Sequence, residues 1–384
     1  MSLKVALVHD WLIHMRGGEK VLESLYEVFP EAEIFTLFYD RRKLSPALKG
    51  AKIHGSFLQL LPGIRSYYRW LLPIMPLAIK SFSLKGYDVV ISSSHCVAKG
   101  CRVPAGTLHV CYCHTPIRYV WGFRQDYFNS FPIFLKAIIH WVLDQFKGWD
   151  LSTNRKVQFF IANSENTRKR IEKFYKREAF VVYPPVNTAH FKPQDSSKTG
   201  DYFLLVSAFV PYKRIDLAIE AFNRLGYPLT IVGDGPERSK LQRKAASNVR
   251  FLGSLSDEEL KVQYEECRAL IFPGEEDFGI VPVEAQAFGK PVIAYAMGGA
   301  LETVTDGTGV FFAQQTPEAL IRAVKRFETL SFHAEVIRNN ALRFDRQVFQ
   351  QKIREVIPTL YNTWRNSVTG KGYTLDNHSA LVRK

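Results

Sequence analysis

The chain has little of what a membrane anchor, a metal centre or a dinucleotide site requires. No run reaches the roughly 18 uncharged apolar residues that a membrane-spanning helix needs. The five cysteines are odd in number and lack metal-ligand spacing, so we expect buried free thiols. There is no Asp-x-Asp pair, and Gly17-Gly18 lacks the third glycine of a dinucleotide fingerprint. These absences argue against a bound metal and against an NAD-dependent enzyme on paired Rossmann domains.

What is present is a large, basic chain of globular composition. Its 384 residues suit two domains, and 46% hydrophobic with 23% charged residues is typical of folded proteins. Residues 1–180 contain 26 Lys/Arg against 14 Asp/Glu, whereas the remainder is nearly balanced. A basic first half suits an anionic membrane surface or a nucleic acid, or simply favours solubility. Free thiols and a start without a signal-peptide pattern predict a cytoplasmic location.

Short apolar runs alternate with helical stretches, which indicates parallel sheets built from βαβ units. Six strands are expected before Pro184-Pro185: 5–8, 34–38, 89–92, 109–112, 159–162 and 180–183. Six more follow the polar stretch Gln194–Gly200: 203–207, 229–232, 249–252, 269–272, 292–294 and 310–312. The sequence therefore predicts two doubly wound α/β domains, at 1–185 and 186–346. Ligands bind at the carboxyl ends of such strands, so two facing domains would form a cleft.

Two glutamates eight positions apart, Glu276 and Glu284, mark the most informative stretch. The apolar run 269–272 predicts a buried strand, and Glu284–Phe288 predicts the start of a helix. A glycine-containing loop between them would leave backbone N–H groups free for a phosphate. One glutamate in the loop and one on the helix could then reach sugar hydroxyls, although both could equally be solvated surface residues.

This segment resembles the Glu-x7-Glu signature of the family-4 retaining glycosyltransferases. Five further blocks match in the family's order: Gly17–Glu19, His114–Trp121, Pro211–Asp216, Gly233–Pro236 and Gly298–Glu302. The resemblance covers about residues 3–345. It implies a GT-B fold whose last helix returns to the first domain. Residues 347–365, interrupted at Pro358, would form that helix, and 366–384 a tail.

The resemblance also implies the donor site. Lys213, aided by Arg214, would grip a diphosphate, although Ala208 stands where the family often has an additional arginine. Glu276 would bind the donor sugar and Glu284 the ribose. The remaining donor contacts would come from Gly17, Gly18, Gly233 and the backbone of Phe278, Gly279, Ile280 and Val281. Gly233 could equally just form a tight turn.

The acceptor half and the chemistry follow from the same resemblance. His114 would contact the donor sugar or steer the acceptor and, with Glu276 and Lys213, form the catalytic set. Arg118, Tyr119 and Trp121 would flank the acceptor. The leaving diphosphate itself would accept the incoming hydroxyl's proton. The nucleotide sugar is then a substrate, and no cofactor or metal is expected.

Two stretches of mixed apolar, aromatic and basic residues, Phe57–Lys80 and Phe131–Leu143, suit a membrane interface or the cover of a core. They favour a lipid-linked acceptor and a peripheral position at the inner membrane face. The blocks around His114 and Lys213 resemble mannosyltransferases of O-antigen and exopolysaccharide assembly. GDP-mannose is therefore the expected donor, with UDP-glucose and UDP-N-acetylglucosamine as alternatives. A nucleic-acid-binding function is disfavoured because no RNA- or DNA-reading motif is recognisable.

Overall fold

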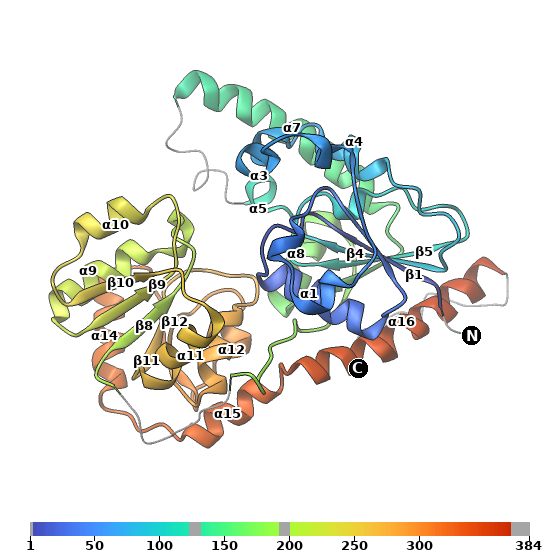
Figure 1. The fold of residues 1–384 in the computed structure, drawn as a ribbon. Helices are drawn as coiled ribbons and strands as arrows, with labels where there is room; N and C mark the ends of the chain where they lie inside the picture. Colours follow the sequence, from blue (N-terminus) through green and yellow to red (C-terminus); the bar gives the residue numbers. More distant parts are fainter. Residues whose placement is uncertain (1–2, 123–131, 192–199, 370–384) are drawn as a thin grey trace. The chain divides into compact units, whose positions relative to one another are not determined.

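A computed structural model describes residues 3–122, 132–191 and 200–369, and the chain divides into two compact units (Figure 1). Unit 1 contains the described residues of Met1–Pro185 and of Gln347–Lys384, and unit 2 is Val186–Arg346. Each unit contains one parallel sheet flanked by helices. Most of the polar stretch 194–200, the residue Phe131 and most of the expected tail lie outside the described residues.

Unit 1 is built on seven parallel strands in the order β3-β2-β1-β4-β5-β6-β7. They are β1 (Val5–His9), β2 (Glu33–Thr36), β3 (Ile53–Gly55), β4 (Val89–Ser94), β5 (Leu108–Cys113), β6 (Phe159–Ala162) and β7 (Ala179–Val181). Every residue of β1, β4 and β5 is buried, as expected for a parallel sheet covered on both faces. Alternate residues of β1 enter different cores: Val5 and Leu7 one, Ala6 and Val8 the other.

The helices of unit 1 include two long ones and many short turns. They are α1 (Gly17–Val28), η1 (Arg41–Lys43), α2 (Pro46–Lys49), η2 (Phe57–Leu60), α3 (Ile64–Tyr67), η3 (Tyr68–Leu71), α4 (Met75–Lys80), η4 (Ala98–Gly100), α5 (Arg118–Trp121), α7 (Ile133–Asn154), α8 (Glu165–Tyr175) and α16 (Arg346–Val368). The stretch 57–80 contains Pro62, Pro73 and Pro76 and forms several short turns rather than one long helix. None of the described helices is long and apolar enough to cross a membrane.

The C-terminal helix α16 packs on unit 1, as expected for a GT-B chain, but Pro358 does not interrupt it. Ile353, Ile357 and Leu360 are buried in the same core as β1, at the spacing of one helical face. Pro358 is exposed. The backbone carbonyl that loses its partner to this proline can therefore bond to water, and the buried face keeps the helix continuous.

Unit 2 has six parallel strands in the order β10-β9-β8-β11-β12-β13. They are β8 (Phe203–Val206), β9 (Leu229–Val232), β10 (Val249–Gly253), β11 (Ala269–Phe272), β12 (Val292–Tyr295) and β13 (Gly309–Phe312). Its helices are η5 (Pro211–Lys213), α9 (Ile215–Leu225), α10 (Arg238–Lys244), α11 (Asp257–Glu266), α12 (Ile280–Ala287), α13 (Ala300–Thr303), α14 (Pro317–Phe327) and α15 (Ala334–Leu342). Helix α12 begins at Ile280, four residues before the predicted start at Glu284. Gly279, in a left-handed backbone conformation, precedes its first turn.

Candidate active site

In unit 2, the loops after β8 and β11 bring Lys213 and Glu276 together. These strands are neighbours, but the chain continues from them towards opposite edges of the sheet. A sheet of this topology has its ligand crevice at that point, outside the carboxyl ends of the strands. Lys213 Nζ forms an ion pair with Glu276 Oε1, and the two side chains are only 14% and 22% exposed. The sequence placed both residues in a donor site, and the fold makes them direct neighbours.

Glycines hold the loop that carries Glu276 tightly against its surroundings. A Cβ added at Gly274 would lie 3.0 Å from the Lys213 Cα. Gly299 donates its N–H to the Glu276 carbonyl at 2.8 Å, and a Cβ there would lie 2.3 Å from the Phe278 backbone. Gly298 has φ +65°, and a Cβ added to it would lie 2.3 Å from the backbone carbonyl oxygen of Glu276. The Gly298-Gly299 pair therefore fixes the loop by close backbone contact.

The N-terminus of α12 adjoins this loop. Gly279 adopts φ +85° immediately before Ile280, and no side chain caps the first turn within the described part of the chain. Backbone N–H groups in the first turn of an α-helix lack intrahelical partners and carry partial positive charge. The backbone of Phe278, Gly279, Ile280 and Val281 thus has the geometry that suits a phosphate oxygen.

Glu284 lies within α12 and is 6% exposed. Its Oε2 accepts a hydrogen bond of 2.9 Å from the hydroxyl of Tyr264, which is fully buried on α11. Burial and the neighbouring carboxylate raise the pKa of Tyr264 well above its usual value, so its hydroxyl remains a donor. The tyrosine orients Glu284, and no local sequence pattern pointed to this contact because the two residues are twenty positions apart.

Arg214 and Gly233 have local partners in unit 2. Arg214 occupies the left-handed region at φ +53°, with Nε 3.3 Å from Asp216 Oδ1 and a second nitrogen 3.5 Å from Gln315 Oε1. Gly233 has φ +132°, and a Cβ there would lie 1.9 Å from the Ser207 oxygen. Backbone crowding is thus sufficient to require this glycine, and the donor contact assigned to it stays a prediction.

In unit 1, the carboxyl ends of β1, β4 and β5 gather three histidines: His9, His95 and His114. Their ring centroids lie 6.1–6.4 Å apart. His9 and Ser93 are register partners on β1 and β4, and Ser93 Oγ lies 3.1 Å from His9 Nδ1 and 2.8 Å from His114 Nε2. The sequence singled out His114 alone. His9 and Ser93 lie in strands and His95 in the turn after β4, and none of them carries a motif of its own.

A buried carboxylate anchors the same edge. Asp10 accepts hydrogen bonds from the backbone N–H groups of residues 95–98 at 2.6–2.9 Å. It also faces His95 Nδ1 at 3.0 Å. One side chain after β1 thereby fixes the whole turn after β4, which rigidifies the histidine cluster.

Two of these imidazoles, those of His9 and His114, are held neutral. Burial, with help from His95, lowers the pKa of His114 to about 3 and that of His9 well below its usual value. Glu19 on α1 is 6% exposed, and burial raises its pKa. Gly17 and Gly18 begin α1 beside this cluster: a Cβ at Gly18 would lie 3.6 Å from His9 Cε1 and 3.7 Å from His114 Nε2. These are ordinary van der Waals distances, so the start of α1 lies directly beside both rings.

Arg118, Tyr119 and Trp121 form the short helix α5. Tyr119 lies with its hydroxyl 3.0 Å from Cys96 Sγ, and the indole N–H of Trp121 donates to Asp150 Oδ2 at 2.7 Å. Asp150 is fully buried and also pairs with Lys99 at 2.6 Å. The polar atom of Trp121 is thus committed to the interior of unit 1, and only its ring face would serve an acceptor. The acceptor roles of these residues stay predictions.

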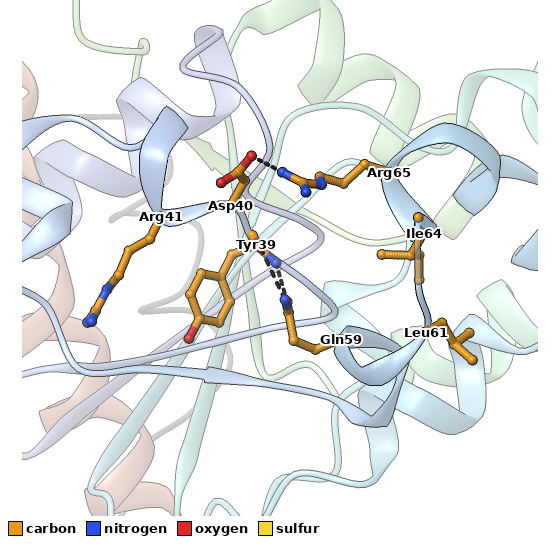
Figure 2. A pocket seen from close by; sticks show the side chains of 8 residues that line it. Tyr39, Asp40, Arg41, Gln59, Leu61, Ile64 and Arg65 are labelled. Carbon is orange, nitrogen blue, oxygen red and sulfur yellow. Dashed lines mark hydrogen bonds and ion pairs between the residues drawn. The ribbon is translucent and has the colours of Figure 1, made fainter.

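A hollow of about 370 Å³ lies elsewhere on unit 1, lined by Tyr39, Asp40, Arg41, Gln59, Leu61, Gly63, Ile64 and Arg65. Figure 2 shows Arg65 directed at Asp40 and the side chain of Gln59 directed at Tyr39. Asp40 also pairs with Arg42 at 3.1 Å. Because two guanidinium groups are already bound to this carboxylate, the hollow is better explained as a structural ion-pair cluster than as an anion site. Across residues 3–122, 132–191 and 200–369, no group of three suitable side chains is placed to hold a metal.

Comparison with known proteins agrees with this geometry. The model of Glycosyltransferase Family 4 matches residues 15–190, and that of Glycosyl transferases group 1 matches residues 186–344. Together they account for residues 15–344. The chain belongs to the family-4 glycosyltransferases.

Individual relatives are more distant. The chain is 27% identical over 223 residues to the O-antigen chain mannosyltransferase C of Escherichia coli, which is 53% of this chain and 58% of that protein. It is 31% identical over 176 residues to the D-rhamnosyltransferase WbpZ of Pseudomonas aeruginosa, which is 44% of this chain and 46% of that one. The chain thus spans about half the length of these relatives. The structure of Anabaena HepE in complex with UDP covers 93% of this chain, and all of HepE is matched, with TM-score 0.69 and 18% identity. This similarity shows the GT-B fold.

Proposed function

We propose that this family-4 chain is a retaining glycosyltransferase that moves mannose from GDP-mannose to a lipid-linked saccharide during cell-surface polysaccharide or glycolipid synthesis. The observation that carries the proposal is the Lys213–Glu276 pair, held beside the N-terminus of α12 at the topological switch of unit 2. A cation and the backbone amides at the start of a helix suit a diphosphate there, and carboxylates suit sugar hydroxyls. Family membership supports sugar transfer, and the Escherichia coli relative supports mannose.

Donor binding would exchange the partners of this pair. Without ligand, Lys213 and Glu276 neutralise each other in a setting where an unpaired charge would be costly. An arriving diphosphate would take Lys213, together with the amides of Phe278 to Val281. Glu276 would then be released to accept hydrogen bonds from the sugar, while Glu284, oriented by Tyr264, binds the ribose.

The chemistry then needs no metal and no cofactor. As the glycosidic bond to the diphosphate breaks, negative charge develops on the leaving oxygen, and Lys213 and the loop amides would stabilise it. In the retaining mechanism of this family, the acceptor hydroxyl attacks on the same face and gives its proton to the departing diphosphate. His114 and Glu276 would hold the sugar while this exchange proceeds.

Calorimetry with GDP, UDP and their sugar conjugates tests the donor. We expect GDP to bind more tightly than UDP, and GDP-mannose to be turned over with retention of anomeric configuration. The UDP in the HepE structure supports UDP-glucose and UDP-N-acetylglucosamine as alternative donors. Tighter binding of UDP would contradict the mannose assignment, and no binding of either nucleotide would contradict the donor site.

The acceptor end of the proposal depends on an apolar surface of unit 1, which we call the apolar ridge. It comprises the exposed side chains Phe57, Leu60, Leu61, Trp70, Ile74 and Leu77, with Ile133, Ile138 and Trp141 of α7. Both stretches pack their other residues into the same core, and Figure 1 places α3, α4 and α7 together. The exposed cations Arg65, Arg69 and Lys80 accompany the ridge. Exposed apolar residues among cations suit the headgroup region of an anionic membrane, which supports peripheral attachment at the inner face.

Vesicle partitioning tests this surface. Leu71 and Leu72 pack against the core, so the informative change is the double variant Trp70→Ala/Leu77→Ala, whose residues are 67% and 66% exposed. We expect it to bind vesicles containing anionic lipid more weakly than the wild type. Val336 on α15 is 50% exposed in unit 2, so Val336→Ala is the matched control. Equal partitioning of all three proteins would contradict the membrane assignment.

A further inference from the structure

The contact between Ser93 and two histidines constrains where the protons lie. The Ser93 hydroxyl has one proton and lies within hydrogen-bond distance of His9 Nδ1 and His114 Nε2. It can therefore donate to one ring and accept from the other, provided that both rings are neutral. Neutrality is expected near pH 7, because burial holds the pKa of both imidazoles low.

Two arrangements satisfy the contact and also give the Ser93 proton an acceptor. If both rings donated to Oγ, that buried proton would have no acceptor within the described residues. In the first, His9 Nδ1–H donates to Ser93, and the Ser93 hydroxyl donates to His114 Nε2, so that the proton of His114 is on Nδ1. In the second, both directions are reversed, and His9 carries its proton on Nε2. His9 is fully buried, and its Nε2 has no hydrogen-bond partner within the described part of the chain. The second arrangement would therefore bury an unpaired N–H donor, which folded proteins rarely do.

The first arrangement therefore holds. His9 carries its proton on Nδ1 and a lone pair on the buried Nε2, and the Ser93 hydroxyl donates to His114 Nε2. The proton of neutral His114 then lies on Nδ1.

We propose that Ser93 is a positioning residue that holds His114 in the Nδ1–H tautomer, so that His114 serves sugar transfer as a hydrogen-bond donor. Its catalytic meaning rests on the proposed function, whereas the tautomer can be measured without any substrate. The Nδ1–H group can donate to a hydroxyl or to a developing negative charge on oxygen. It cannot remove a proton from the acceptor, which agrees with the leaving diphosphate as the base.

The tautomer is tested by long-range ¹H–¹⁵N spectroscopy of the full chain labelled at histidine, near pH 7.5. Protonated and unprotonated ring nitrogens resonate far apart, and loss of one set of signals in His114→Gln assigns that ring. We expect His114 to carry its proton on Nδ1 in the wild type. A spectrum with the proton on Nε2 would overturn the inference.

Ser92 provides a matched control, because its Oγ lies 2.9 Å from His109 Nε2 on the other face of the same strand. Ser93→Ala should shift the His114 population towards Nε2–H, whereas Ser92→Ala should perturb only the His109 signals. An unchanged His114 spectrum in Ser93→Ala would overturn the inference.

Turnover separates the inference from the proposed function. Loss of one hydrogen bond that orients His114 should lower kcat by about 10-fold in Ser93→Ala, with little change in Ser92→Ala. A wild type that transfers sugar alongside an equally fast Ser93→Ala overturns the positioning role alone. A wild type that transfers from no nucleotide sugar overturns the proposed function and leaves the tautomer result standing.

Discussion

Both units have polar groups at the carboxyl ends of their strands, but the residues and interactions at these two edges differ. In unit 2, glycine-rich loops bring a lysine and a glutamate into an ion pair that remains partly exposed. In unit 1, buried histidines and a serine at the ends of β1, β4 and β5 are linked by hydrogen bonds and held neutral. The first edge suits the stabilisation of charge, and the second suits the precise direction of a neutral donor.

The largest expected effect tests the charged edge. Lys213→Ala should lower kcat/KM by at least about 100-fold, because it removes the cation that would stabilise the leaving diphosphate. Lys240→Ala is the control, since Lys240 is a 55% exposed lysine of the same unit that pairs with Glu237. Both variants should keep the wild-type circular dichroism spectrum. Near-normal turnover of Lys213→Ala would show that the edge of unit 2 does not act by stabilising charge.

Glu276→Ala probes the other half of the pair, and we expect a loss of similar size, about 100-fold, because its sugar contacts would strengthen in the transition state. Glu237→Ala is the matched control, being a 21% exposed glutamate that is also paired with a lysine. If Glu276→Ala raises KM and leaves kcat unchanged, the residue binds the ground state and the transition state equally and is not part of the catalytic set.

The close packing of the glycine loop predicts a stability cost. A side chain at Gly299 would meet the Phe278 backbone at 2.3 Å, so Gly299→Ala should destabilise unit 2 by roughly 1–3 kcal/mol and weaken nucleotide binding. Gly148 lies within α7 with open space around its Cβ position. Gly148→Ala should stabilise unit 1 by roughly 0.5–1 kcal/mol. Urea unfolding distinguishes the two, and equal stability of Gly299→Ala and the wild type would show that the loop yields easily.

The difference between the edges also explains what the sequence could predict. Twelve of the thirteen strands in the described part of the chain were predicted, because buried parallel strands are continuous apolar runs. The missed strand, β3, is three residues at the sheet edge, Ile53-His-Gly55, with no buried side chain. Pro358 was predicted to interrupt the last helix, because local propensity alone does not show a packed face that keeps the helix continuous.

The candidate site divides in the same way. Lys213, Glu276 and the glycines were singled out from the sequence because loops carry their chemistry in short contiguous motifs. Asp10, His9 and Ser93 were missed, since each lies in or beside a strand and is brought to the site by register across three strands. Only pairing brings Ser93 to His9, and no local pattern in a single sequence encodes that pairing.

Acid should destabilise unit 1 through its buried imidazoles. The pKa values of His9, His109 and His114 are below the usual 6.5, with His109 at about 4, so the unfolded chain binds protons first as pH falls. The free energy of unfolding is therefore retained above about pH 6.5 and falls towards pH 4. Protonation of His109 in the unfolded chain alone lowers it by roughly 2 kcal/mol at pH 5. All six tryptophans lie in unit 1, so urea unfolding followed by their fluorescence reports this unit. His109→Gln should show a shallower pH dependence, and a slope equal to that of the wild type would contradict the assignment.

The smallest expected effect tests whether the site of unit 2 also depends on a neutral hydrogen-bond donor, the hydroxyl of Tyr264. Tyr264→Phe removes the hydroxyl that orients Glu284 and should weaken binding of the nucleotide by about 3- to 10-fold. Tyr202→Phe, which loses a hydroxyl bonded to the Gln263 carbonyl in the same unit, is the control. If Glu284 holds the ribose, the wild type should prefer GDP over its 2′-deoxy analogue, and Tyr264→Phe should discriminate less. If Tyr264→Phe discriminates as well as the wild type, helix α12 alone positions Glu284. Hydrogen bonds from a neutral side chain would then matter only at the edge of unit 1.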